Sequence, residues 1–223
     1  NTGVKELLVD SGSDPEKQPT ITGVLLENNK KVMADKVIVA TGGISYASTG
    51  STGDGYRFAT ETGHKLVECK PSLVPFETEE KWCGMLQGLA LKNVKATLVV
   101  DQKKVFSQMG ELLFTHFGVS GPLILTASSV LAQKKNYESV KLYIDLKPAL
   151  TEEQFDKRLL REFEEAKNKQ LKNVLPAVYP SSLAALIPQL AETDETKSVH
   201  SVTREERKRL VEVTKNLELT IKG

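Results

Sequence analysis

The 223-residue sequence predicts an α+β chain assembled from more than one part. Three observations lead to this expectation. An apolar, mostly β-branched run at residues 37–40 ends in two glycines and is followed by a helical segment, which is typical of an α/β unit. Residues 76–146 contain short alternating segments typical of strands. From Thr151 onward, apolar residues recur at helical spacing.

The composition is that of an ordinary globular protein. The chain is 39% hydrophobic and 26% charged, with a net charge of +1. Because Lys and Arg alternate with Asp and Glu, we expect neither nucleic acid nor an anionic membrane as a partner. No apolar run is long enough to cross a bilayer. The two cysteines, Cys69 and Cys83, lack a metal-binding spacing, and we expect reduced thiols in a cytoplasmic protein.

The first part of the chain is expected to combine a small antiparallel sheet, one inner strand and one helix. Asn28-Asn29 is a pair that tolerates positive φ, which predicts a hairpin turn. Gly63 is a suitable residue to follow a helix C-terminus, and His64 beyond it is expected to serve the helix end rather than act as a base. The expected strands are residues 4–9, 21–26, 31–33, 37–40 and 66–69, and the expected helix is 54–63.

Two glycine-rich bends in this part predict a ligand site. Ala40-Thr41-Gly42-Gly43 ends the run that we expect to be a strand buried on both faces, and ligands of open α/β sheets lie at such strand ends. Thr52-Gly53-Asp54-Gly55 follows closely and opens the helix. The alternative is that the first bend is only a turn and that Asp54 is only an N-cap.

The remainder is expected to form a β-rich part and then a helical part. Residues 94–100, 105–108, 111–114 and 140–146 are predicted strands, and a helix is predicted over 122–133. Thr151 and Thr203 each begin a capping box, Thr-x-x-Gln or Thr-x-x-Glu, which predicts a helix start. Two further short helices are expected at 171–178 and 183–190, and a last strand at 217–221. The expected domains are 1–72, 73–147 and 148–215, with 216–223 returning to the first.

Four segments together resemble one bacterial flavoprotein family, whose members are described as NAD(P)/FAD-dependent oxidoreductases or aminoacetone-oxidase-like FAD enzymes. The segments appear in the family's order and span most of residues 1–122, whereas the helical part matches only in pattern. They are Ala40–Gly43, Thr49–Tyr56, Leu86–Asn93 and Leu113–Pro122.

The resemblance implies a two-dinucleotide-binding-type FAD domain, with an insert made of a small β-barrel and a helical bundle. It places Ala40, Thr41, Gly42 and Gly43 against FAD, together with residues 52–55. Because a carboxylate at a helix N-terminus repels phosphate, Asp54 is expected to accept from a ribityl or ribose hydroxyl instead. The family's opening Gly-x-Gly-x-x-Gly segment is absent from residues 1–223, so we expect a piece of a longer protein that does not retain FAD alone.

The resemblance further implies that the longer protein transfers electrons between a small organic substrate and flavin, with nicotinamide (NAD(P)H) or oxygen as the second partner. Thr115 and His116 are the candidate catalytic residues, because imidazole moves protons near neutral pH. The alternative for His116 is that it caps the following helix. A different function, a recognition module without activity, also stays open. Gly118-Val-Ser-Gly121 does not have the Gly-x-Ser-x-Gly spacing of a serine hydrolase.

Overall fold

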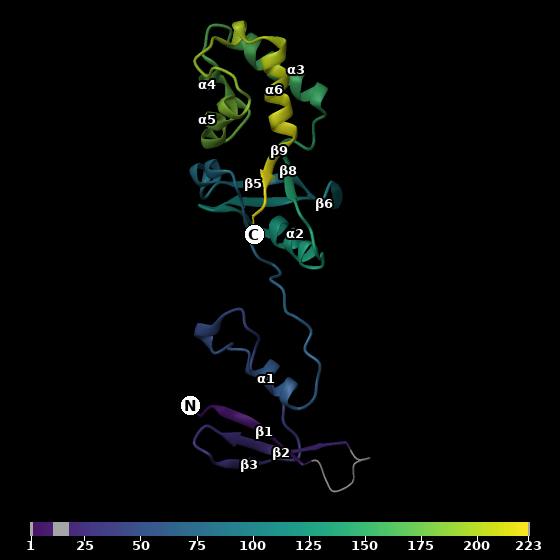
Figure 1. Cartoon of the computed structure of the whole chain (residues 1–223). Helices are drawn as coiled ribbons and strands as arrows, with labels where there is room; N and C mark the ends of the chain where they lie inside the picture. The colour runs from purple at the N-terminus through teal and green to yellow at the C-terminus, as the bar shows by residue number, and fades with distance from the viewer. Residues whose placement is uncertain (1, 11–17, 223) are drawn as a thin grey trace. The chain divides into compact units, whose positions relative to one another are not determined.

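The computed structural model describes residues 2–10 and 18–222 and divides the chain into two compact units, Asn1–Cys69 and Lys70–Gly223 (Figure 1). Each unit has its own sheet. The sheet of the first unit has the order β1-β2-β3, and the sheet of the second has the order β4-β7-β6-β5-β8-β9. The mixture of helices and antiparallel strands agrees with the predicted α+β class.

The first unit is a three-stranded antiparallel sheet with one helix. The predicted hairpin is confirmed: Asn29 has φ of 61°, and the Asn28 side chain accepts a hydrogen bond from the Lys30 N–H at 3.1 Å. The helix is followed by Gly63 at φ of 88°, as predicted for a helix C-terminus. The elements are β1 (Val4–Asp10), β2 (Thr20–Leu26), β3 (Lys31–Met33), the 3₁₀ turn η1 (Ala47–Thr49) and α1 (Asp54–Glu61).

The predicted inner strand at 37–40 is wrong for this structure. These residues have no strand assignment, and Ile38 is 92% exposed rather than buried on both faces. The predicted strand at 66–69 is also missing, and Val67 is exposed. A strand requires a hydrogen-bonded neighbour, and none of the described residues pairs with either segment. The two-dinucleotide-binding-type sheet therefore remains an expectation.

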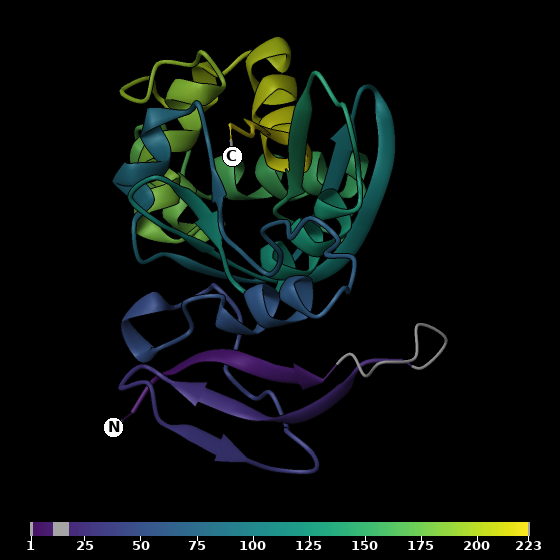
Figure 2. The ribbon, with the colours of Figure 1, turned by 60° about the horizontal axis from the view of Figure 1, so that its bottom comes forward.

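The six-stranded sheet of the second unit curls until its edge strands meet. The Glu79 N–H donates to the Thr220 carbonyl at 3.0 Å, and the Lys222 N–H donates to the Glu77 carbonyl at 2.8 Å, which joins the two edges. Figure 2 shows the long strands (teal) curving. The strands are β4 (Phe76–Glu77), β5 (Ala90–Val100), β6 (Lys103–Phe114), β7 (Gly118–Ser120), β8 (Val140–Asp145) and β9 (Leu217–Thr220).

Alternation along the strands explains the core of this sheet. In β5, Val94, Ala96 and Leu98 are buried while Lys95 between them is exposed, as expected when successive side chains point to opposite faces. β6 is one continuous strand, whereas the sequence predicted two. The reason is that β6 pairs with β5 over nearly its whole length, including the stretch around Gly110.

The last strand does not return to the first unit, contrary to the expectation for 216–223. β9 pairs antiparallel with β8, with Leu219 opposite Leu142. Both side chains are fully buried, so burial in the curled sheet explains this pairing.

The helical part begins at the first of two capping boxes. Thr151 and Thr203 each accept from the backbone N–H three residues on, and the side chains of Gln154 and Glu206 accept from the backbone N–H of the two threonines, as predicted. The helices of this unit are η2 (Lys81–Leu86), α2 (Pro122–Ala132), α3 (Glu152–Glu165), α4 (Leu171–Val174), η3 (Leu175–Ala177), α5 (Ser181–Leu190), η4 (Val199–Ser201) and α6 (Arg204–Lys215).

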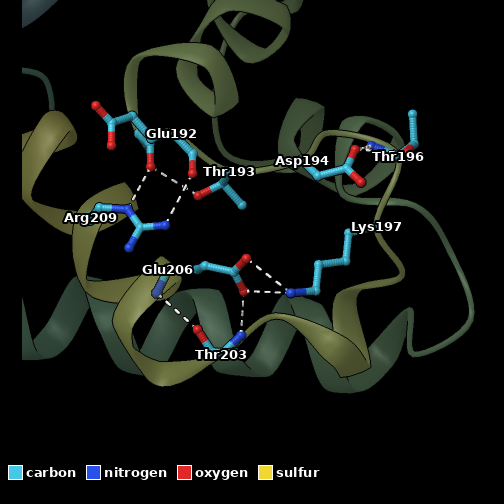
Figure 3. A network of polar contacts seen from close by, with 9 residues as sticks. Glu192, Thr193, Asp194, Thr196, Lys197, Thr203, Glu206 and Arg209 are labelled. Carbon is cyan, nitrogen blue, oxygen red and sulfur yellow. Dashed lines mark hydrogen bonds and ion pairs between the residues drawn. The ribbon is translucent and has the colours of Figure 1, made fainter.

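A polar network ties the connection between α5 and α6 to α6 itself (Figure 3). Glu206 accepts two hydrogen bonds from the Lys197 ammonium, both at 2.9 Å, and caps the helix through Thr203. Arg209 donates to the carbonyls of Ala191 and Glu192 at 2.8 and 3.0 Å. These bonds order a loop that has few apolar residues of its own.

Candidate functional site

The structure brings the two glycine-rich bends of the first unit into contact. The Gly53 N–H donates to the Gly43 carbonyl at 3.2 Å. A Cβ on Gly55 would lie 2.8 Å from the Thr41 hydroxyl oxygen, and one on Gly42, whose φ is 73°, would lie 2.6 Å from the Ser51 hydroxyl oxygen. Glycine is favoured at Gly42 by its positive φ, whereas a side chain at Gly55 would require the Thr41 hydroxyl to move.

Asp54 is not the N-cap of α1, because Gly53 holds that position and Asp54 is the first helical residue. The Asp54 carboxylate accepts from the Thr52 hydroxyl at 3.0 Å and from the Arg57 guanidinium at 3.2 Å. Both bonds lower the pKa of Asp54, and the bond from Arg57 has the larger effect. The site therefore presents an ionised carboxylate that accepts hydrogen bonds.

Arg57 was not predicted as part of this cluster. Its guanidinium also donates to the Lys5 carbonyl at 2.6 Å and pairs with Glu61 at 3.2 Å. The i, i+3 spacing from Asp54 and the i, i+4 spacing to Glu61 on a predicted helix were the signals that could have identified it. The contact with Lys5 joins α1 to β1, and no sequence pattern predicts it.

A crevice of about 640 Å³ lies beside one end of this cluster. Among the predicted cofactor-binding residues, Gly55 lines the crevice, whereas residues 40–43 and 52–54 do not. The walls are mainly apolar and come from β1, from β2 and the two residues before it, from residue 39, and from α1 and residues 62 and 64 after it. The full lining is Leu7, Val9, Gln18, Pro19, Ile21, Val39, Gly55, Phe58, Ala59, Thr62 and His64.

Thr115 and His116 lie in the tight turn between β6 and β7. The Thr115 N–H donates to the Gly118 carbonyl at 2.9 Å, and the Thr115 hydroxyl oxygen is buried without a hydrogen-bond partner among the described residues. The His116 ring packs edge-on against Phe117 with centroids 4.8 Å apart, and the residue is exposed. His116 does not cap α2, because the N-cap is Gly121.

Three further observations on the described residues concern cysteine reactivity, metal binding and membrane-spanning helices. Cys69 and Cys83 are both free thiols, and burial raises the pKa of the Cys83 thiol to about 11, so it is a poor nucleophile. No group of three or more His, Cys, Asp or Glu in the described ranges is arranged to hold a metal ion. No helix within those ranges has both the length and the apolar character needed to cross a membrane.

Comparison with known proteins gives one family match and several relatives. The family described as "HI0933-like protein barrel and H2TH domain" matches residues 70–223. The chain is 32% identical to the ribosomal RNA dihydrouridine synthase of Escherichia coli, over 77% of this chain and 40% of that protein. It is 30% identical to the Haemophilus influenzae protein of the same name, over 99% of this chain and 53% of that protein.

A third relative is named for a different activity. The 3-dehydro-bile acid delta(4,6)-reductase of Clostridium scindens is 27% identical over 76% of this chain and 41% of that protein. The chain therefore spans about half, or less, of the length of the three relatives named here.

Proposed function

This chain belongs to the family of HI0933-like proteins with a barrel and H2TH domain, and from that premise we propose that it is part of an FAD-dependent reductase. The reductase saturates a carbon–carbon double bond conjugated to a carbonyl group. The proposal is supported by the reactions for which the relatives are named, since both reduce a carbon–carbon double bond next to a carbonyl group. A dihydrouridine is a uridine with two added hydrogens across C5 and C6 of the ring, next to a carbonyl. A delta(4,6)-reductase of a 3-dehydro steroid acts on double bonds conjugated to a ketone.

The proposed substrate is a uracil base in ribosomal RNA. Two relatives with this printed activity are at least 30% identical to the chain, and one match covers 99% of it. The near-neutral net charge predicted no nucleic acid as a partner, and the family resemblance implied a small organic substrate; the bile acid reductase favours that alternative. Substrate class is therefore the first property to measure.

The residues of the first unit fit part of a dinucleotide cofactor. In the proposal, the ionised Asp54 and the Thr52 and Thr41 hydroxyls hold hydroxyl groups of FAD. When bound, FAD would supply the hydride-transfer chemistry between a reduced nicotinamide and the C5–C6 double bond of the uracil ring, with the hydride going to C6. A proton goes to C5, so that the ring gains two hydrogens while the nicotinamide is oxidised.

His116 is the proposed proton donor to C5. Its imidazole is exposed and packs edge-on against Phe117, so its ring nitrogens are open to an external partner. Thr115 precedes it, but its hydroxyl oxygen is buried and so is not available to a substrate in this structure; the proposed role of Thr115 is to hold the turn through the bond from its N–H to the Gly118 carbonyl.

The test uses the protein at the length of its relatives, with reduced nicotinamide. We expect a yellow protein that converts uracil in ribosomal RNA to its dihydro form, detected by mass spectrometry of digested RNA. His116→Gln should retain flavin and slow turnover by about 100-fold. His200→Gln is the matched control, since the His200 ring has one hydrogen bond among the described residues, to the Lys167 carbonyl at 2.9 Å, far in sequence from the turn at Thr115 and His116.

The flavin site has its own variant. Asp54→Ala in the same protein should lower the flavin content, measured by absorbance after gel filtration. Unchanged flavin content would exclude Asp54 from cofactor binding and leave it a local structural role through Thr52 and Arg57. A colourless protein at full length would refute the proposed function and favour a recognition module. Reduction of a small conjugated ketone, with no change in RNA, would refute the RNA substrate alone.

A further inference from the structure

A pocket of about 230 Å³ lies where the curled sheet meets the helical part of the second unit. Its walls are mostly apolar side chains, and those of Leu91, Val94, Leu146 and Leu183 are buried. An apolar cavity of about 150 Å³ already holds a benzene ring, so this pocket has room for a ring and a small polar group. The lining residues are Ala90, Leu91, Lys92, Val94, Leu146, Lys147, Tyr179, Pro180 and Leu183.

Two lysines line the pocket and no acid does. Lys147 is half-buried, whereas Lys92 is exposed. In the described part of the chain, neither ammonium forms an ion pair or donates a hydrogen bond. An ammonium that is partly removed from water without a carboxylate partner carries a desolvation cost, and an anion in the pocket would offset that cost.

The charged groups around Lys147 do not balance its ammonium. Asp145 accepts from the Lys147 N–H at 2.9 Å and pairs with the Lys215 ammonium at 2.6 Å, so its charge is already neutralised. Burial, and after it the positive charge of Arg158, lowers the pKa of Lys147. Both effects disfavour the charged form of the amine, and a bound anion would oppose them.

Tyr179 forms the wall nearest to this ammonium. The Lys147 Nζ atom lies 5.9 Å from the centroid of the Tyr179 ring, within the range of a cation–π interaction. The ring is held in place because it packs edge-on against Phe155 and its hydroxyl is 2.6 Å from that of Thr214. Tyr179 therefore offers a ligand its ring but not its hydroxyl, and Lys147 is left to bind the charged group.

The cations of two other pockets in this unit already have carboxylate partners. In the groove of about 460 Å³ between α3 and α6, Arg207 pairs with Asp156. In the pocket of about 420 Å³ beside α3, Arg158 and Arg161 share the carboxylate of Glu162, at 3.8 and 3.5 Å. Because their charges are balanced, these two pockets have less need of an anion than the pocket at Lys147.

We propose that the pocket at Lys147 binds a small organic carboxylate whose apolar body is about the size of one aromatic ring. The carboxylate accepts from the Lys147 ammonium, and the apolar body packs against Leu91, Val94 and Leu183. A singly charged carboxylate suits these walls better than a phosphate, because a second negative charge would add to the desolvation cost. Neither Asp54 nor His116 lines the pocket, so the inference goes beyond the proposed function and does not depend on it.

The test compares three ligands by isothermal titration calorimetry on the protein at the length of its relatives. Benzoate has the charge and the ring, benzamide has the same shape without the charge, and acetate has the charge without the ring. We expect benzoate to bind at least about tenfold more tightly than benzamide, because a hydrogen bond to a charged group is stronger than a neutral one. Benzoate should also bind at least about tenfold more tightly than acetate, because acetate leaves the apolar walls unfilled.

Lys147→Met removes the ammonium and keeps the apolar stem and the backbone. Its Kd for benzoate should rise at least about tenfold, while its Kd for benzamide should change by less than about twofold. The matched control is Lys104→Met. Lys104 is exposed, has no ion pair among the described residues, and lies at the opposite end of the β5–β6 hairpin from Leu91, so both affinities should stay unchanged.

Four results would overturn the carboxylate pocket. Equal affinities for benzoate and benzamide would exclude the ionic contact, and equal affinities for benzoate and acetate would exclude the apolar body. Unchanged benzoate binding by Lys147→Met would place the ligand elsewhere. Absence of benzoate binding up to about 10 mM, the Kd of a nine-atom ligand of ordinary efficiency, would exclude the site. The ligand comparison uses the unsubstituted protein, so it decides the question even if Lys147→Met does not fold.

Discussion

One buried hydrogen bond links two helical segments and allows a sharp test of the structure. The hydroxyls of Tyr179, which follows η3, and Thr214, in α6, are 2.6 Å apart. Tyr179 is 4% exposed and Thr214 is 0% exposed. Because the Thr214 hydroxyl donates to the Leu210 carbonyl at 2.6 Å, Tyr179 must be the donor to Thr214. Burial raises the pKa of Tyr179 above its ordinary value, so the phenol stays protonated at neutral pH.

The two single variants should have unequal costs. Tyr179→Phe removes the donor and leaves Thr214 bonded to Leu210, which should lower the free energy of unfolding by about 1 kcal/mol. Thr214→Val removes the acceptor and leaves a buried phenol without a partner, at a cost of about 1–3 kcal/mol. The double variant has no stranded hydroxyl, so its cost should be smaller than the sum of the two by about 1 kcal/mol or more.

Urea denaturation followed by tryptophan fluorescence measures these costs. The sequence has one tryptophan, Trp82, which packs near Phe114 in the second unit, so the signal reports on the unit that contains the pair. Strictly additive costs would refute the coupling. A Thr214→Val variant as stable as the unsubstituted chain would refute the inference that the phenol is stranded.

Two further predictions concern the same helical part. Leu159→Ala should lower the free energy of unfolding by about 2–5 kcal/mol, because Leu159 is 0% exposed. Its neighbour Leu160 is 38% exposed, so Leu160→Ala should cost less than about 1 kcal/mol. The urea midpoints of the two variants measure the difference. Bonds from the Thr203 N–H and then from Lys197 lower the pKa of Glu206, so its contribution to stability is present above the unfolded value of 4.5 and is lost as pH falls through the lower folded value. Glu206→Gln keeps the cap acceptor, so stability curves against pH should lose this acid-side decline, and an unchanged curve would contradict the assignment.

Local features of the sequence were sufficient for several elements. The capping boxes at Thr151 and Thr203 predicted the starts of α3 and α6, because capping depends only on residues within one turn. Asn29 and Gly63 predicted positive φ for the same local reason. The two glycine bends were predicted only as parts of a ligand site; the hydrogen bond from the Gly53 N–H to the Gly43 carbonyl, which joins them, is known from the structure alone.

Pairing over long distances could not be predicted in this way. Residues 37–40 have the composition of a buried strand, but composition cannot supply the neighbour that a strand needs. The partner of β9 lies more than seventy residues earlier, in β8, and no pattern within 217–220 identifies it. The contact of Arg57 with Lys5 is of the same kind.

By itself, the sequence determined the local conformations of this protein: helix caps, left-handed turn residues and the alternation that separates core from surface. These depend on interactions within a few residues, which a linear pattern contains. The tertiary structure alone decided which strands close the curled sheet, that Arg158 and Arg161 share one carboxylate, and that the Thr115 hydroxyl is buried without a partner. Burial and charge balance depend on which distant segments come together, and a linear pattern does not record that.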